Sequence, residues 1–305
     1  MARRLARRAT ADRAAGMKAI LNLFKARIGF AIALTAVAGL MVDPGAAIEP
    51  WRGVVLALAV MLSSAAAGAF NQYWEVDLDA KMGRTRTRPF VTGRMRAHRG
   101  WLALILALTG IAVAAAWFAA NASAALYTFL GAFFYAVVYT VWLKRRTKWN
   151  IVIGGLAGSF AVLAGASAVT PSLSAEAIVL AVILFLWTPP HFWSLAIAFR
   201  EDYARAGVPM LPVVVGDRRA TYAILGHSVV LVALSLGLAL LSPGWLYLAC
   251  AAAGGALLLR HTVALVREPS RPRAMASFHA SLIQLALLLL GVICDAWVRA
   301  ALAAG

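Results

Sequence analysis

Apolar and polar stretches alternate along the whole chain. Nine apolar stretches are separated by short segments that carry most of the charged residues. A helix that crosses a bilayer needs about 20 predominantly apolar residues, and stretches of roughly this size are typical of such helices. The pattern predicts an all-α membrane protein with nine transmembrane helices in a single bundle, at 28–42, 53–74, 101–119, 123–143, 150–170, 176–198, 221–241, 244–259 and 280–298.

Composition supports the same class. Of the 305 residues, 63% are hydrophobic and 13% are charged, whereas charged residues make up about 25% of an average globular protein. So many apolar residues leave little sequence for a soluble core. The composition therefore excludes a soluble enzyme, a disordered chain and a fibrous protein.

The formal net charge of +17 has a strongly uneven distribution. The N-terminal tail and alternate polar segments hold 27 of the 29 Lys and Arg residues, in 1–27, 75–100, 144–149, 199–220 and 260–279. Basic loops mark the cytoplasmic side of a membrane protein. We therefore expect a cytoplasmic N-terminus and a C-terminus outside, and the charge indicates topology and not nucleic-acid binding.

Residues 1–27 form a basic segment without the apolar core of a secretory signal. We expect it to lie on the cytoplasmic membrane surface and to contact anionic lipid. Residues 28–300 then form one intramembrane domain, with functional cytoplasmic loops at 75–100 and 199–220. The expected location is a bacterial cell inner membrane, with the mitochondrial inner membrane as the alternative. Cys250 and Cys294 fall inside apolar stretches, where we expect buried, unpaired thiols.

Acidic residues form a cluster where the second apolar stretch ends. Asn71, Glu75 and Asp79 are spaced i, i+4 and i+8, which places them on one face of a helix. Carboxylates at this spacing repel one another unless a cation lies between them, and Mg²⁺ prefers such oxygen ligands together with substrate phosphates. The alternative is that these acids only cap and solvate the helix end.

Basic residues follow the acids closely. Arg84 and Arg88 carry planar guanidinium groups suited to phosphate, and Lys144 and Arg145 end the fourth apolar stretch on the same side. Acids that hold a metal beside arginines that hold phosphate predict a diphosphate site. For Lys144 and Arg145, anchoring the helix end at the membrane surface remains an alternative.

A second acidic group, at Glu201 and Asp202, follows the sixth apolar stretch on the same side. Two opposed acidic groups suit two metal ions around one diphosphate. We therefore assign Asn71, Glu75, Asp79 and Asp202 as catalytic metal ligands for Mg²⁺, with Mn²⁺ as the alternative ion. A helix cap is the other role open to the second group.

These motifs resemble those of the UbiA-type intramembrane prenyltransferases. The family pattern N-x-x-x-D-x-x-x-D occurs here with Glu75 in place of the first Asp, and the matching segments read NQYWEVDLDAKMGRTRTRPFVTGRM, YTVWLKRRTKWNIVIGG and WTPPHFWSLAIAFREDYARAGVPMLPVVVG. The last segment resembles the heme-prenylating branch of the family. The resemblance implies farnesyl diphosphate as donor, protoheme IX as acceptor, heme O as product, and a heme A synthase or terminal oxidase assembly as partner.

His191 follows Thr188-Pro189-Pro190, where we expect a break in the sixth helix that turns the imidazole into a cavity. An ionisable residue inside a membrane is a functional candidate, so we assign His191, together with Tyr203, to the heme acceptor. A histidine that only bonds a neighbouring carbonyl is the alternative. Two other functions stay open: prenyl transfer to another aromatic acceptor, as in quinone synthesis, and heme transport.

Overall fold

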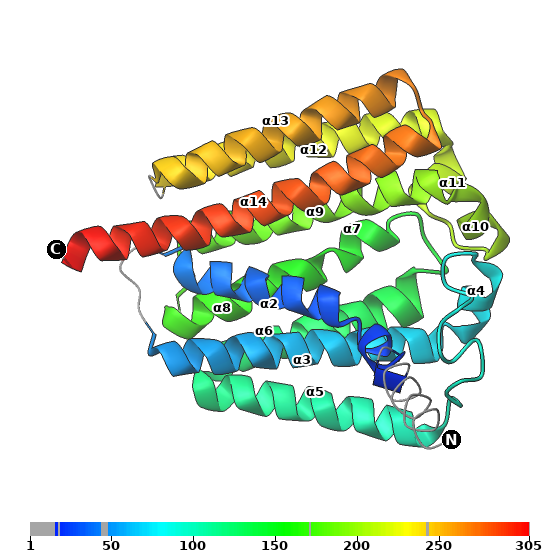
Figure 1. Ribbon diagram of the computed structural model, residues 1–305, viewed down its shortest axis with the longest axis horizontal. Helices are drawn as coiled ribbons and strands as arrows, with labels where there is room; N and C mark the ends of the chain where they lie inside the picture. Colours follow the sequence, from blue (N-terminus) through cyan, green and yellow to red (C-terminus); the bar gives the residue numbers. More distant parts are fainter. Residues whose placement is uncertain (1–15, 18, 44–47, 171, 242–243, 305) are drawn as a thin grey trace, which may run out of the picture.

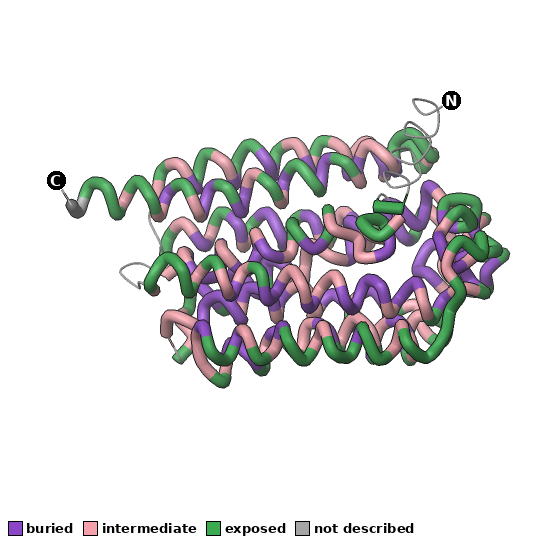
Figure 2. The backbone as a smooth tube through the Cα atoms, turned by 60° about the horizontal axis from the view of Figure 1, so that its bottom comes forward, coloured by how far each residue is buried: buried purple, intermediate pink, exposed green. Residues whose placement is uncertain are grey.

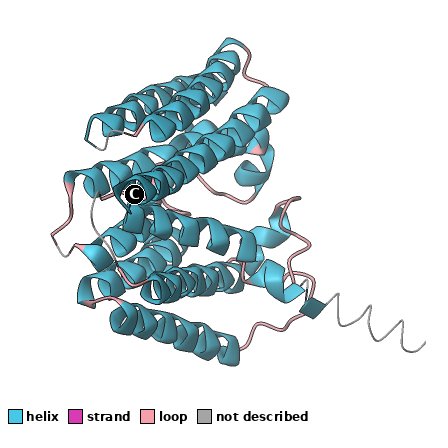
Figure 3. Cartoon of the chain, turned by 60° about the vertical axis from the view of Figure 1, so that its left-hand side comes forward, coloured by secondary structure: helices cyan, strands magenta, loops and turns pink. Residues whose placement is uncertain are grey.

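The computed structural model describes residues 16–17, 19–43, 48–170, 172–241 and 244–304. All regular structure in these ranges is helical (Figure 3), which confirms the all-α prediction. Most of the predicted basic segment, residues 1–27, lies outside the described residues.

Long helices run roughly parallel or antiparallel across the molecule (Figure 1). Eight described segments are long and apolar enough to cross a membrane, while a shorter apolar helix, α2, has 16 residues and a rise of about 24 Å. The protein is therefore a multi-pass membrane protein, and the count of nine crossings stays a prediction. The long elements are α2 (Ala26–Met41), α3 (Pro50–Trp74), α5 (Arg99–Ala119), α6 (Ala122–Phe133) continued by the π-helix η1 (Phe134–Leu143), α7 (Asn150–Gly154) with α8 (Leu156–Val169), α9 (Ala175–Ala198), α12 (Asp217–Leu241), α13 (Trp245–Arg267) and α14 (Arg271–Ala304).

Three short helices gather at one end of the bundle: α4 (Val76–Lys81), α10 (Arg200–Arg205) and α11 (Leu211–Val215) (Figure 1). Together with the loop 82–98 they form what we call the charged end. The helix α2 begins toward this end and α14 finishes at the opposite one. The charged end is the one that the distribution of basic residues predicts to face the cytoplasm.

Close backbone contact joins α2 to α8 at the centre of the bundle. A Cβ atom at Gly165 would overlap the carbonyl oxygen of Ala36, and one at Gly39 would overlap that of Val162. Small residues allow membrane helices to approach at this distance. Buried positions face the interior along the helices while exposed ones face outward (Figure 2).

The sixth helix is not broken, contrary to the sequence expectation. Pro189 and Pro190 lie inside α9, which continues to Ala198. The two prolines lack the N–H groups that would bond the carbonyls of Phe185 and Leu186, and membrane helices tolerate proline where neighbouring groups satisfy the freed backbone. The helices α13 and α14 also extend eight and nine residues past their predicted charged-end limits, because basic residues such as Arg260 and Arg273, which end an apolar stretch in the sequence, do not end a helix.

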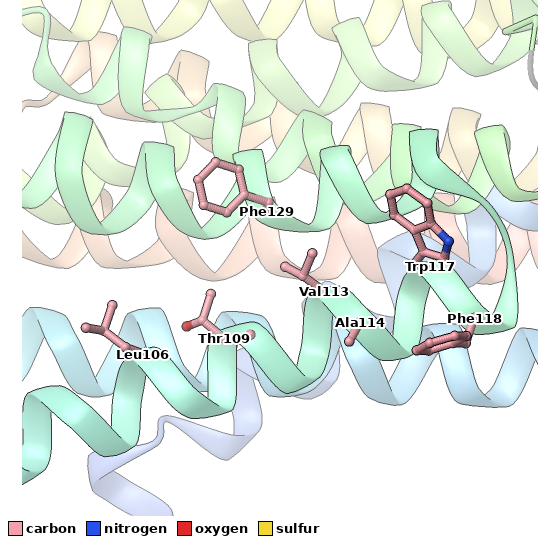
Figure 4. A pocket seen from close by; sticks show the side chains of 8 residues that line it. Leu106, Thr109, Val113, Ala114, Trp117, Phe118 and Phe129 are labelled. Atoms are coloured by element: carbon pink, nitrogen blue, oxygen red, sulfur yellow. The ribbon is translucent and has the colours of Figure 1, made fainter.

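The outer surface is apolar. A groove of about 540 Å³ runs along α5 and α6, and its lining, which includes Leu106, Val113 and Trp117, carries no titratable group (Figure 4). This chemistry suits lipid chains. Cys294 is exposed and Cys250 is partly exposed, so the expectation of two buried thiols was wrong: apolar residues of a membrane protein also cover its outside.

Candidate active site

The three side chains of the first acidic cluster lie on one buried face. Asn71 is the fourth residue from the end of α3, Glu75 joins α3 to α4, and Asp79 lies in α4. Backbone hydrogen bonds from Glu75 N to Asn71 O (3.0 Å) and from Asp79 N to Glu75 O (2.8 Å) keep the helical register through the junction. All three residues are at most 3% exposed, whereas Asp77 between them points outward.

Three cations surround this face, each from a different part of the chain. Lys144 Nζ lies 2.5 Å from a Glu75 oxygen, and Arg88 lies 2.5 Å from an Asp79 oxygen. Lys25 Nζ donates to Asn71 Oδ1 (2.8 Å) and to the hydroxyl of Tyr135 (2.9 Å). Two carboxylates thus face three basic side chains, and the excess positive charge suits a diphosphate.

Lys25 reaches the site because the chain turns sharply before α2. It is the one non-glycine residue with a positive φ in the described ranges (47°), a conformation that costs free energy for a side-chain-bearing residue. Its aliphatic stem packs against the backbone of α3 at Gly68, where a Cβ would come within 3.2 Å of it. The strain is compensated by contacts that aim the ammonium group at Asn71.

The π-helix η1 supplies the wall of the site that faces the acidic side chains. Its i to i+5 spacing appears in the hydrogen bond from Lys144 N to Tyr139 O (2.9 Å). Thr140 accepts from Asn71 Nδ2 (3.1 Å), and the rings of Tyr135 and Tyr139 stack 5.8 Å apart beside the ammonium groups of Lys25 and Lys144. Single π-helical segments often occur at functional sites, and here one orients several polar groups toward the acids.

Burial shapes the charges of this cluster. It lowers the pKa of Lys25 to about 7, with Arg88 adding to the shift and Glu75 opposing it. Burial likewise raises the pKa of Asp79 above its ordinary value, while the neighbouring Arg88 acts in the opposite direction. Both groups are therefore poised to gain from a ligand that brings in opposite charge.

The second acidic group lies across the charged end on α10. Asp202 accepts a hydrogen bond from the backbone N–H of Gly83 (3.0 Å) and pairs with Arg205. This bond ties α10 to the loop after α4. Within the described ranges, no three His, Cys, Asp or Glu side chains are grouped so as to hold a metal ion. The structure thus presents two separate acidic groups joined through Gly83.

The first group has the donor chemistry of a hard-cation site. One carboxylate oxygen of Glu75, Oε1, is buried without a hydrogen-bond partner, and an unpartnered buried carboxylate oxygen is costly. Asn71 and Asp79 add further oxygens on the same face. The residues present therefore fit Mg²⁺, which binds through one or two carboxylates and substrate phosphates.

The remaining basic candidates differ in their surroundings. Arg145 forms a bidentate ion pair with Asp77, with N–O distances of 2.7 and 2.8 Å. This pairing lowers the pKa of Asp77 and raises the pKa of Arg145. Arg84 is exposed, with its guanidinium 5.9 Å from the ring of Phe199. Arg145 thus links the end of η1 to α4, and Arg84 is available to a ligand at the charged end.

The two acceptor candidates lie in different environments. Tyr203 is buried in an apolar cluster with Leu78, and Tyr139 packs against this cluster. His191 is buried between the rings of Trp187 and Phe278, whose centroids lie 4.3 and 4.4 Å away. Its Nδ1 lies 2.8 Å from the hydroxyl oxygen of Ser281 on α14.

The tautomer of His191 follows from this contact. The hydroxyl of Ser281 also lies 2.7 Å from the carbonyl of Phe278, which only accepts hydrogen bonds, so the single hydroxyl proton belongs there. Ser281 must then accept from Nδ1–H of His191. This leaves Nε2 with its lone pair, the form in which a histidine ligates a metal.

Comparison with known proteins identifies the family. Residues 32–288 match the model of the UbiA prenyltransferase family. The chain belongs to this family.

Relatives within the UbiA family are similar over nearly the whole chain. Protoheme IX farnesyltransferase 2 of Paramagnetospirillum magneticum is 57% identical, over 92% of this chain and 98% of its own. Protoheme IX farnesyltransferase of Gluconacetobacter diazotrophicus is 42% identical, over 90% of this chain and 89% of its own.

Solved structures share the UbiA fold at low identity. Digeranylgeranylglyceryl phosphate synthase superposes with a TM-score of 0.73 at 19% identity, covering 92% of this chain and 98% of the synthase. A UbiA homolog from Archaeoglobus fulgidus bound to DMAPP and Mg²⁺ superposes with a TM-score of 0.66 at 18% identity, over 88% of this chain and 98% of that one.

Sequence reasoning missed part of this UbiA site. Lys25, Tyr135 and Thr140 all contact the acidic face or each other, but none belongs to a charged cluster in the sequence. A faint signal exists for Lys25, which with Arg27 is one of two cations inside the mostly apolar segment LNLFKARIGF. Nothing in the sequence marks a π-helix at 134–143.

Proposed function

We propose that this UbiA prenyltransferase transfers the farnesyl group of farnesyl diphosphate to a vinyl group of protoheme IX, giving heme O. The observation that carries the proposal is the 57% identity, over almost the full chain, to a protein named protoheme IX farnesyltransferase. The buried acidic face with its three cations supports the donor half of the reaction.

The donor chemistry explains the charges of the site. Cleavage of an allylic C–O bond leaves a carbocation and a diphosphate anion, so the enzyme must stabilise the leaving group. Lys25, Arg88 and Lys144 are fixed around the acidic face before any substrate binds, and preorganised charges of this kind lower the barrier. We assign Arg84 and Arg145 to the diphosphate as well. Mg²⁺ held by Asn71, Glu75, Asp79 and Asp202 would neutralise diphosphate charge as a Lewis acid.

The acceptor chemistry needs no strong base. A vinyl carbon captures the farnesyl cation, which forms the new C–C bond, and water then captures the porphyrin-side cation and releases a proton. The protein must keep bulk water away until capture. We place heme near His191, with its unprotonated Nε2 toward the iron, and near Tyr203, whose hydroxyl is available to a heme substituent.

The cellular setting extends the proposal. We infer that residues 28–300 act as one prenyltransferase domain in a bacterial inner membrane, that the charged end faces the cytoplasm, and that residues 1–27 contact lipid. Mg²⁺ is the proposed metal ion, and Mn²⁺ is the alternative ion whose support of activity is to be compared with that of Mg²⁺. Because heme O must be handed on, a heme A synthase or a terminal oxidase assembly is the proposed partner.

A product assay tests the proposal directly. Membranes containing the protein receive reduced heme, farnesyl diphosphate and Mg²⁺, and the extracted hemes are analysed by mass spectrometry. We expect a heme that has gained one farnesyl group and one water, and its loss on chelation. If an added aromatic acid were prenylated and no heme product formed, the acceptor would be an aromatic acid and not heme. If the folded protein formed neither product, the result would contradict prenyl transfer.

A further inference from the structure

A second basic feature lies on the outer surface of α13 and α14. A groove of about 500 Å³ begins within the apolar part of α13 and ends at the charged end of the bundle. Three residues that line the groove are apolar or small: Leu259, Val263 and Ala264. The other four are charged: Arg260, Arg267, Glu268 and Arg273. The groove therefore has an apolar part and a basic part, like the two parts of an amphiphile.

The position of Arg260 along α13 is unusual for a charged residue. α13 begins at the exposed Trp245, and tryptophan is enriched at membrane interfaces. Arg260 follows 15 residues later, about 22 Å along the helix, while the hydrocarbon core is about 30 Å thick. A helix that enters the apolar layer at Trp245 therefore places the backbone of Arg260 within that layer, and the side chain is exposed on the outside of the bundle.

The protein does not neutralise this arginine. Glu268 is the only acidic residue that lines the groove, and it pairs with Arg273 (3.6 Å) and not with Arg260. Across the described residues, neither Arg260 nor Arg267 forms an ion pair or a side-chain hydrogen bond. A guanidinium at this depth is costly unless it reaches the interface or meets an anion there.

We propose that this groove binds an anionic phospholipid. Its phosphate accepts hydrogen bonds from Arg260 and Arg267, and an acyl chain lies along Leu259 and Val263. Basic pockets between membrane helices on the cytoplasmic side suit anionic head groups, and two unpaired arginines disfavour a lipid whose head group carries a cation. The α5–α6 groove of Figure 4 is a contrasting case, because it offers apolar contacts but no basic side chain to a head group.

Native mass spectrometry with defined lipids tests this site. The purified full chain is equilibrated with equal amounts of phosphatidylglycerol and phosphatidylcholine of matched acyl chains, and the retained lipid is identified. We expect the wild type to retain phosphatidylglycerol preferentially, and the double variant Arg260→Gln/Arg267→Gln to retain about tenfold less of it. Arg273→Gln should have a smaller effect, because Glu268 already pairs with that arginine.

The matched control is Arg219→Gln, which removes an exposed arginine at the charged end of α12. It should leave lipid retention unchanged, and all variants should keep the helical circular dichroism and thermal midpoint of the wild type. Equal retention of both lipids by the wild type, or undiminished retention by the double variant, would overturn the proposal. Farnesyl diphosphate is also an anionic amphiphile. If farnesyl diphosphate displaced the phospholipid from the groove stoichiometrically, that result would also overturn the proposal.

Discussion

Lys25, Lys144 and Arg88 each place a cation against the same acidic face, but Lys25 alone comes from before the first long helix. Replacing it by methionine, Lys25→Met, keeps most of the stem that packs against Gly68 and removes the charge. We expect kcat/KM for farnesyl diphosphate to fall about 100-fold, the scale of losing one preorganised charge.

Steady-state kinetics in membranes, at saturating heme, measure this change. Arg27→Gln is the control, because Arg27 is exposed and only two residues away. Wild-type kinetics in Lys25→Met, with the control also normal, would show that Lys25 has only a structural role.

Asp79 and Asp77 offer a paired comparison on one short helix. Asp79 is buried and faces Arg88, whereas Asp77 is exposed and faces Arg145. Asp79→Asn should reduce turnover by about 1,000-fold, because it removes a charge that positions both the metal and Arg88. Asp77→Asn should change it less than threefold, since exposed ion pairs contribute little.

Turnover at saturating substrates and Mg²⁺ measures both variants. Asp202→Asn should behave like Asp79→Asn, and Glu75→Asp should keep measurable activity because the carboxylate remains. Full activity in Asp79→Asn membranes would remove the acidic face from the mechanism.

His191 and Ser281 test the acceptor end of the proposal. His191→Ala should raise KM for heme at least tenfold and leave farnesyl diphosphate binding unchanged. Ser281→Ala should have a weaker effect in the same direction, because it frees the imidazole to change tautomer and orientation without removing it. Heme absorption spectra and separate titrations of heme and of farnesyl diphosphate distinguish the effects of the two variants. Unaltered heme kinetics and spectra in His191→Ala would place the acceptor elsewhere.

At the scale of the helices, the close backbone contact between α2 and α8 lies at the centre of the bundle that carries the site. Gly165→Ala puts a methyl group onto the carbonyl of Ala36, and overpacking of this kind costs about 1–3 kcal/mol. We expect a clearly lower thermal midpoint and a matching loss of activity. Gly158→Ala, on the same helix with open space around its Cα, should be neutral or slightly stabilising. Fluorescence-detected thermal unfolding in detergent compares them, and equal midpoints would refute the close contact.

Elements differed in how well the sequence predicted them, for physical reasons. Apolar length and basic loops are properties of a linear sequence, so the long helices and the acidic spacing from Asn71 to Asp79 could be predicted. α9 continues through Pro189 and Pro190 while packed against α8, α12 and α14. The π-helical register at Tyr139 and the contact of Lys25 with Asn71 depend on tertiary packing, which no single-sequence pattern contains.

For the whole molecule, the open question is how many times the chain crosses the membrane. α2 has only 16 residues, about 24 Å, which is shorter than the hydrocarbon layer of about 30 Å. Helical residues 19–23 precede it, however, and α2 packs between α3 and α8 toward the far end of the bundle. We therefore expect it to cross, which makes the crossings odd in number and puts the two chain ends on opposite sides.

Cysteine labelling tests this topology in intact spheroplasts with a membrane-impermeant maleimide. In a background where Cys250 and Cys294 are alanine, Glu49→Cys and Ala301→Cys should react at once, since both positions are exposed, one at the start of α3 and one near the finish of α14, opposite the charged end. Met17→Cys should react only after permeabilisation. Labelling of Met17→Cys and Glu49→Cys from the same side would show that α2 does not cross, and would require Lys25 to reach the acidic face from a helix that enters and leaves the membrane on one side.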